Sequence, residues 1–300
     1  MKSCLSIEVR RARPLIGTFV HIAARGSDLA AVGRAVDAAF TSVTQVHRLM
    51  SFHELESDVS RLNREAFSKP VRVHPWTWHV LKAAQEFSRN SDGVFDITVG
   101  RQLVRWNYLP KHHAAPAGIG SWRDIIIEGP CQVRFRKRLV IDLGGIAKGF
   151  AVDRAVKTLK RQGVTTGIVN AGGDLRVFGP GSQFIHLRRP ATPTRMAGAV
   201  KLSQRAMATS GTYFERRKYR GKGVTPLVCQ PAGRPGRARI SVTVAAAECM
   251  IADALTKVVF ALREKAATLL ARYHADALLL ERDGAPFWTF HAACERSRHI

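Results

Sequence analysis

Hydrophobic positions along the chain fall into two patterns, one typical of strands and one typical of helices. Residues 15–24 are rich in β-branched and aromatic side chains and are bounded by turn residues, which predicts a strand. Apolar residues then recur every three or four positions from Leu29 to Met50, the spacing of one buried helix face. Ser27 or Asp28 can cap the first turn of this helix.

The remaining hydrophobic runs continue the mixture. Short extended segments are predicted at residues 125–127, 133–141, 167–170, 184–187, 199–202, 240–244, 277–280 and 286–290. Helical segments are predicted at residues 57–63, at 76–89, around Val156 and at 247–262. Because strands and helices do not alternate strictly, the pattern favours an α+β fold over a doubly wound sheet.

The length and composition allow a sizeable core. The chain has 300 residues, of which 46% are hydrophobic, and length alone fits either one large domain or two modest ones. Two loose segments, residues 110–121 and 219–237, are too short and too varied to be interdomain linkers. We therefore expect a single domain over residues 1–300, with its core at about 10–290.

The charge is strongly positive. Lys and Arg number 47 against 23 for Asp and Glu, so the surface field attracts phosphates, nucleic acid or anionic lipid. The basic residues are spread along the chain, and signatures of groove reading such as paired zinc ligands are missing. We expect no specific nucleic-acid partner, while weak binding to anionic surfaces stays open.

The cysteines and the hydropathy profile bear on the compartment. Five widely separated cysteines fit neither a disulfide framework nor a metal knuckle, which favours a reducing environment. The first eight residues turn charged before a hydrophobic run of signal-peptide length can form. No stretch approaches the roughly 20 apolar residues of a membrane helix. We expect a cytoplasmic protein without a transmembrane segment.

Two glycine-rich segments carry candidate chemistry in the first half of the chain. In residues 93–100, two glycines bracket a short piece that we interpret as extended, with Asp96 and Thr98 offering hydrogen bonds on one face; a plain strand between turns is the alternative. In residues 141–153, a predicted strand ends in Gly-Gly and leads into a helix. Such a helix start binds phosphate and Lys148 adds a countercharge, although a purely structural turn fits as well.

Three further segments offer polar groups. Residues 169–174 form another strand end with a glycine pair, where Asp174 either contacts a ribose or caps a turn. Residues 207–213 place hydroxyl side chains beside a glycine, which suits phosphate contacts or a hairpin bend. Asp253 lies on a mostly apolar helix, where a carboxylate is costly unless it is paired or functional. Lys257 follows four residues later, so an ordinary helical ion pair is the alternative.

These segments, in this order, resemble the motifs of the ApbE family, which transfers FMN from FAD to a threonine of a partner flavoprotein. The resemblance covers roughly residues 10–290. The matching pieces are RPLIGT at 13–18, the Ser-x-x-x-x-Leu-Asn turn at 57–63, FDxT within 93–100, DLGGIAKG and its following aspartate at 142–153, NAGGD at 170–174, SG at 210–211 and ADAL at 252–255.

The resemblance implies a fold and a site. The fold would be a T-fold-type α+β arrangement of mixed sheets and packed helices around a central nucleotide cleft that holds FAD, with Mg²⁺ near the pyrophosphate. The implied catalytic residues are Lys148 and Asp253, and the implied metal ligands are Gly145, Asp253 and Thr256. The implied cofactor contacts are Ile16, Phe52, Phe95, Asp96, Ile97, Thr98, Lys148, Ala151, Asp174 and Ser210.

Two positions depart from the family's pattern. Its His-x-x-Asp-Pro-x-x-Gly segment corresponds to residues 227–233, where Leu227 and Gln230 replace the histidine and the aspartate. Its metal-ligating threonine corresponds to Lys257, with Thr256 one position earlier. A lysine ammonium cannot ligate magnesium, although it can supply part of a metal's charge.

Three hypotheses follow. The first is an FAD-dependent protein FMN transferase that acts on the threonine of a flavoprotein acceptor and releases AMP. The second is a non-catalytic FAD-binding protein or flavin carrier, which the substitutions at Leu227, Gln230 and Lys257 would explain. The third is a nucleic-acid binder that uses the positive charge, and its binding would fall steeply with salt.

Overall fold

An eight-stranded antiparallel sheet forms the centre of the computed structural model, which describes residues 7–111, 120–213, 215–228, 240–281 and 285–291. Its strands run in the order β1-β2-β6-β7-β10-β13-β14-β15. Their bounds are β1 Ile7–Leu15, β2 Thr18–Gly26, β6 Thr166–Ala171, β7 Asp174–Phe178, β10 Ala206–Gly211, β13 Ile240–Ala246, β14 Asp276–Glu281 and β15 Ala285–Phe290. The structure combines helices with an antiparallel sheet, which confirms the predicted α+β class.

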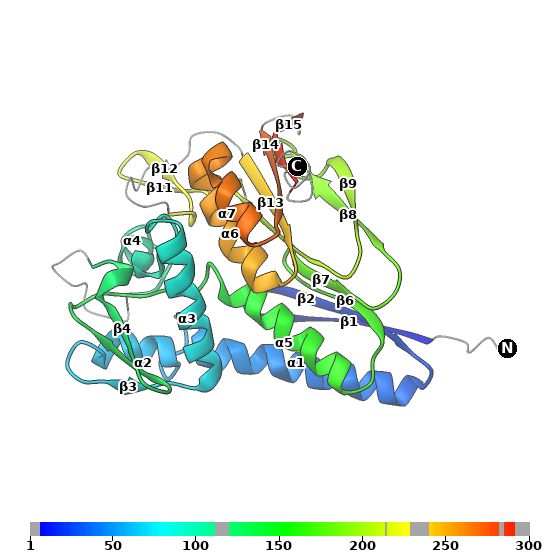
Figure 1. Ribbon diagram of the computed structural model, residues 1–300, viewed down its shortest axis with the longest axis horizontal. Coiled ribbons are helices and arrows are strands. Elements are labelled where there is room, and N and C mark those ends of the chain that lie inside the picture. Colours follow the sequence, from blue (N-terminus) through cyan, green and yellow to red (C-terminus); the bar gives the residue numbers. More distant parts are fainter. Residues whose placement is uncertain (1–6, 112–119, 214, 229–239, 282–284, 292–300) are drawn as a thin grey trace, which may run out of the picture.

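Three long helices cover one face of this sheet (Figure 1). They are α1 Leu29–Met50, α5 Ala147–Arg161 and α6 Cys249–Leu262, and α5 packs between the other two. The hairpin of β8 Gln183–Arg188 and β9 Met196–Leu202 closes the other face, where its Leu187 and Leu202 pack against apolar side chains of the large sheet. Among the described residues, no helix is both long and apolar enough to cross a membrane.

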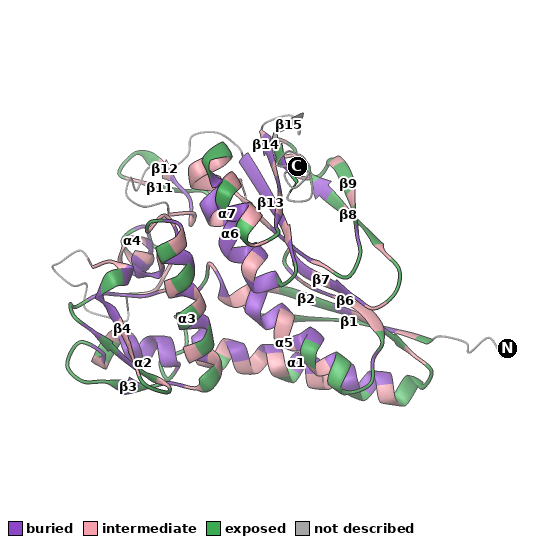
Figure 2. Cartoon of the chain, viewed as in Figure 1, coloured by how far each residue is buried: buried purple, intermediate pink, exposed green. Residues whose placement is uncertain are grey.

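A smaller region lies beside the large sheet. Its three-stranded sheet has the order β3-β5-β4, and helices α2, α3 and α4 lie beside it (Figure 1). The bounds of its elements are α2 Asp58–Glu65, β3 Val71–Arg72, α3 Pro75–Asn90, α4 Gly100–Arg105, β4 Ile125–Glu128 and β5 Gln132–Phe135. Elsewhere, the fold includes a hairpin of β11 Arg217–Tyr219 and β12 Lys222–Val224, and the helix α7 Ala267–Arg272. One hydrophobic cluster includes buried residues of both regions, and Figure 2 shows buried stretches of the chain in each. The single domain stays a prediction.

Helix α1 follows the sequence pattern closely. Asp28 is the N-cap, and its carboxylate accepts hydrogen bonds from the backbone N–H groups of Ala30 (2.8 Å) and Ala31 (3.3 Å). The apolar face that the spacing predicts is buried from Val32 to Met50, with Val36 and Phe40 at its centre, whereas Leu29 in the first turn is exposed. The predicted helix from Leu29 to Met50 is therefore confirmed.

The predicted strand at residues 15–24 begins in the wrong place. The chain turns at Ile16 and Gly17, whose φ angles are 48° and 74°, and this turn joins β1 to β2. Strand β1 is a mostly exposed edge strand with three arginines, so it lacks the alternation that marks a half-buried strand. The turn matters because Ile16 and Gly17 line a cavity of the protein.

Two further extended predictions are wrong. Residues 93–100 are not extended but form turns and the short 3₁₀ helix Ile97–Val99, because the Asp96 carboxylate caps it by accepting from the Thr98 N–H at 2.8 Å. The run at 133–141 ends as a strand at Phe135. Beyond it, the side-chain amide of Asn63 holds both backbone groups of Ile141, at 2.8 and 3.0 Å, in place of a strand neighbour.

Two central strands escaped the sequence prediction. Strand β7 begins at Asp174, directly after the glycine pair, and β10 occupies residues around Ser210 for which the sequence suited either phosphate contacts or a hairpin bend. Both strands lie in the middle of the large sheet. Within the loose segment 219–237, the structure places the end of the β11–β12 hairpin, while residues 229–237 lie outside the described residues.

Candidate active site

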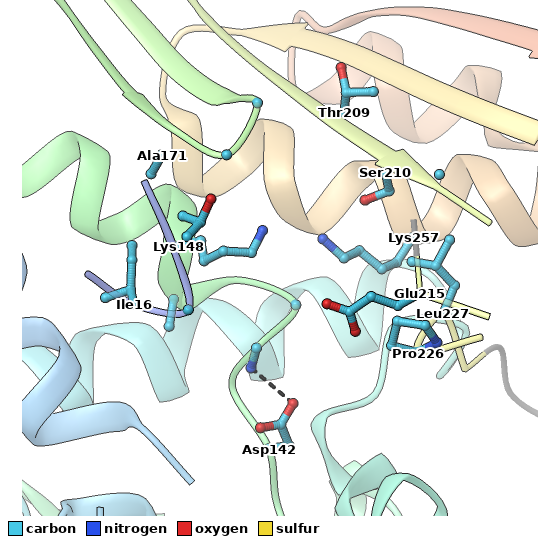
Figure 3. Close-up of a pocket in the computed structure, with 18 of the residues that line it drawn as sticks. Ile16, Asp142, Lys148, Ala171, Thr209, Ser210, Glu215, Pro226, Leu227 and Lys257 are labelled. Atoms are coloured by element: carbon cyan, nitrogen blue, oxygen red, sulfur yellow. Dashed lines mark hydrogen bonds between the residues drawn. The ribbon is translucent and has the colours of Figure 1, made fainter. Parts of the chain in front are cut away.

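A cavity of about 930 Å³ lies where the large sheet meets the smaller region (Figure 3). The loops that line it come from separate parts of the chain: the turn at 16–19, residues 51–53, 94–97 and 142–148, the hairpin at 170–173, the end of β10 and residues 226–228. The volume falls within the range of pockets that bind small molecules and cofactors.

The start of helix α5 forms one wall of the cavity. Gly144, Gly145, Ala147 and Lys148 line it, so the positive end of the helix dipole faces the space. Asp142 shapes the approach to the helix, because its carboxylate accepts a hydrogen bond from the Gly144 N–H at 3.0 Å (Figure 3). This arrangement favours an anionic ligand.

Lys148 and Asp174 form an ion pair at the edge of the cavity, here called the α5 pair. The Asp174 side chain is buried, whereas 37% of the Lys148 side chain is exposed. Burial lowers the pKa of Lys148, but the carboxylates of Asp174 and Asp253 outweigh it and raise that pKa above its ordinary value. The lysine is therefore charged at neutral pH and can reach a ligand.

Asp253 and Lys257 form a second ion pair one turn apart on α6, here called the α6 pair. Asp253 has no exposed surface, and its Oδ2 also accepts from the Gly149 N–H at 3.1 Å. Lys257 Nζ donates both to the Asp253 carboxylate and to its carbonyl oxygen, the latter at 2.9 Å. Figure 3 shows Lys257 and Lys148 pointing toward one another across the cavity.

Close packing of α5 on α6 holds the two pairs together. A Cβ on Gly149 would lie 2.3 Å from the carbonyl oxygen of Cys249, so only glycine allows this approach. Asp153 on α5 accepts from the backbone N–H groups of Cys249 (3.0 Å) and Met250 (2.9 Å) at the start of α6, and it also pairs with Arg176. Asp153 thus fixes where α6 begins relative to α5.

Comparison with known proteins identifies the family to which this chain belongs. A model of the ApbE family matches residues 16–279, which is most of the chain. The protein belongs to the ApbE family.

Its relatives agree over most of their length. It is 27% identical over 252 residues to the FAD:protein FMN transferase of Vibrio cholerae, a match that covers 79% of this chain and 75% of that protein. It is 27% identical over 313 residues to the enzyme of the same name from Treponema pallidum, with 92% and 85% covered. The crystal structure of the ApbE protein of Thermotoga maritima matches with a TM-score of 0.83 and 25% identity, covering 97% of this chain and 99% of that one.

The residues that the ApbE resemblance implies fall into two groups. One group lines the cavity: Ile16, Phe52, Phe95, Asp96, Ile97, Gly145, Lys148 and Ser210. The other lies behind these residues and supports them: Thr98, Ala151, Asp174, Asp253 and Thr256. Thr98 donates to the Gly120 carbonyl at 3.3 Å, and Ala151 is buried in the core. Their roles toward a cofactor stay predictions.

Asp96 has a structural task of its own. Its two carboxylate oxygens accept from the backbone N–H groups of Thr98 (2.8 Å) and Trp122 (3.1 Å). Burial raises the pKa of Asp96, and these N–H groups oppose that shift. The carboxylate therefore holds two loops together at the cavity. The interpretation of residues 93–100 as extended could not reveal this role.

Several cavity residues of this ApbE protein escaped the sequence reasoning. Arg188 enters from β8, and Tyr213 and Glu215 enter from the segment after β10. The hydroxyl of Tyr108 lies within hydrogen-bonding distance of the Glu215 carbonyl (2.6 Å), which holds this segment near the cavity, and Figure 3 shows the Glu215 side chain within it. No local motif marks them. Leu227, where the family has histidine, also lines the cavity, whereas Gln230 lies outside the described residues.

Two of the three implied metal ligands, Asp253 and Thr256, are already engaged within the protein. Mg²⁺ requires near-octahedral oxygen ligands at about 2.0–2.1 Å. The oxygens of Asp253 already accept from Lys257, Gly149 and the hydroxyl of Thr256, the last to its carbonyl at 2.7 Å. Within the described ranges, no group of three or more His, Cys, Asp and Glu residues could hold a metal ion. The side chains as folded do not fit Mg²⁺ at Asp253.

Proposed function

We propose that this protein is an FAD:protein FMN transferase, which moves FMN from FAD to a threonine hydroxyl of a partner flavoprotein and releases AMP. Membership of the ApbE family supports the proposal, and curated relatives carry that name. The observation that carries it is the glycine-lined cavity in which the charged Lys148 stands at the start of α5.

The cavity suits a diphosphate at its centre. Glycines 144, 145, 172 and 173 line it, so backbone N–H groups can approach phosphate oxygens without side-chain obstruction. Lys148 and Lys257 face this space from opposite sides (Figure 3) and would donate charged hydrogen bonds to the phosphate oxygens. Phosphoryl transfer depends chiefly on such positioning and charge neutralisation.

The proposed reaction is one displacement at phosphorus. The threonine oxygen of the acceptor attacks the FMN-side phosphorus and forms a new P–O bond. The bond from that phosphorus to the bridging oxygen breaks, and AMP leaves with the bridging oxygen. The hydroxyl proton passes to solvent. Lys148 and Lys257 would hold the phosphates in line and offset the charge that develops on the leaving oxygen. No step is assigned to Mg²⁺, because Asp253 offers it no open ligand.

Incubation of the pure protein with FAD and candidate acceptors tests this function. We expect covalent flavin fluorescence on the acceptor in a denaturing gel, with release of AMP. The variant Lys148→Met should bind FAD about 10- to 100-fold more weakly, because it loses a charged hydrogen-bond donor. Lys157→Met is the matched control, since Lys157 is exposed on the same helix outside the cavity.

The same experiment separates the alternative functions. Protein that binds FAD tightly but never releases AMP would instead be a flavin carrier, and Leu227 in the cavity is the residue that would explain the loss. Binding of nucleic acid would be distinguished by salt, since backbone contacts weaken steeply as salt rises, whereas a specific FAD site does not.

The partner and the compartment complete the proposal. The acceptor is a flavoprotein with a target threonine, and weak attraction to anionic surfaces is supported by the net charge of +24. A cytoplasmic location is supported by the free thiols of Cys131 and Cys249. Cell fractionation with an antibody to this chain would test the location, and recovery in the periplasmic fraction would overturn it.

A further inference from the structure

We propose that the ammonium group of Lys257 takes the place of a divalent cation, so that this protein grips the diphosphate of FAD without metal. This inference rests on the proposed FAD site. It concerns the charge that the chain itself supplies there.

The first argument is position. Lys257 Nζ contacts the carboxylate and the carbonyl oxygen of Asp253. The lysine side chain also passes Gly145, because a Cβ placed on Gly145 would lie 3.5 Å from Lys257 Cε. Gly145 and Asp253 are two of the three positions that the family resemblance marks as metal ligands. The lysine therefore extends between them and lines the cavity.

The second argument is the third ligand position. Thr256 is fully buried, and its hydroxyl donates to the Asp253 carbonyl at 2.7 Å. The same hydroxyl lies 2.8 Å from the hydroxyl of Ser210, which lines the cavity. Its proton and one of its two lone pairs are thus engaged inside the protein. A threonine one position earlier on the helix does not restore the ligand that Lys257 replaces.

The third argument is the cost of an unpaired charge. Asp253 has no exposed surface, and an isolated carboxylate in such a place needs a cation beside it. Lys257 supplies this cation permanently, with only 16% of its side chain exposed. A metal ion would have to displace the ammonium from the oxygens that both require. A tethered cation cannot be removed by a chelator or depleted by dilution.

The first test compares FAD binding with and without metal. The dissociation constant, measured by quenching of flavin fluorescence, should agree within about twofold in excess EDTA and in excess Mg²⁺. Wild-type protein that loses FAD in EDTA and regains it with Mg²⁺ would overturn the proposal. The control is Lys265→Thr, since Lys265 is exposed in the 3₁₀ helix Arg263–Ala266 that follows α6 and does not line the cavity.

The second test reverses the substitution. Lys257→Thr places a hydroxyl one turn after Asp253, and we expect its FAD affinity to rise at least about tenfold on addition of Mg²⁺. Lys257→Met removes the cation without a replacement, so its FAD affinity should fall in both conditions. Equal affinity of Lys257→Met and wild type would contradict the proposal. Circular dichroism would verify that both variants are folded.

A readout that needs no FAD separates this inference from the proposed function. Mn²⁺ can substitute for Mg²⁺ and is detected by electron paramagnetic resonance. The wild-type chain should take up no Mn²⁺ at this site, whereas Lys257→Thr should bind it. One tightly bound Mn²⁺ in the wild type that Asp253→Asn abolishes would refute the role of Lys257. If FAD fails to bind at all, the proposed function falls, while the Mn²⁺ comparison still decides the cation.

Discussion

The two lysine–aspartate pairs at the cavity are alike in chemistry but differ in construction. The α5 pair joins Lys148 on α5 to Asp174 on β7, and more than a third of its lysine side chain is exposed. The α6 pair joins Asp253 to Lys257 within one helix turn, and its carboxylate is fully buried. The difference indicates that Lys148 is free to follow a ligand, while Lys257 is fixed in place as part of the wall.

The largest expected difference between the two pairs is the loss of stability when the carboxylate of each is removed. Asp253→Ala leaves the Lys257 ammonium and the Gly149 N–H without their buried partner, so it should lower the free energy of unfolding by about 3–5 kcal/mol. Asp174→Ala leaves Lys148, which can turn to water, and should cost about 1–3 kcal/mol. Urea unfolding of both variants measures the difference. If the two variants lost equal free energy of unfolding, the greater burial of the α6 pair would have no effect on stability.

The contact between α5 and α6 offers a way to move one pair relative to the other. In Gly149→Ala the new methyl group meets the Cys249 carbonyl, so the helices must separate, at a cost of about 1–3 kcal/mol in unfolding free energy. FAD affinity should fall as Lys257 shifts away from Lys148. The control Gly198→Ala, where a Cβ meets no atom within 4 Å, should be near neutral. Thermal unfolding and FAD titration report the two effects.

The smallest expected effect is that of pH on the α5 pair. The pKa of Lys148 is raised above its ordinary value of 10.5, so the stabilisation from this pair is fully present below that pH and is lost only as pH rises through the folded pKa. FAD affinity should therefore change by less than about threefold between about pH 7 and about pH 9. Titration with FAD across this range measures it, and a steep loss near pH 8 would contradict a charged Lys148.

Asp153 illustrates how far local reasoning extends. The sequence placed it after the glycine-rich turn, as the aspartate that completes a family motif. Its carboxylate reaches the first backbone N–H groups of α6, about a hundred residues later in the chain. Burial raises the pKa of Asp153, and the Arg176 guanidinium opposes that shift. No spacing in the sequence reveals such a cap, because its acceptor and donors lie on different helices.

The sequence by itself determined the features that depend on neighbouring residues. The buried face of α1 follows from apolar spacing, and its cap follows from Asp28. The glycines 144, 145, 172 and 173 mark turns in which no side chain obstructs the backbone. The pairing of Asp253 with Lys257 also follows from helix geometry, since residues four apart share a face.

Only the tertiary structure decided which of these features meet. The extended prediction for residues 93–100 is wrong because the Asp96 carboxylate finds partners in Thr98 and Trp122 that outweigh strand propensity. The strand at β10 was missed because its small polar residues acquire a strand's environment only between β7 and β13. That Lys257 reaches Gly145 was decided by the packing of α6 on α5, which brings together residues more than a hundred positions apart.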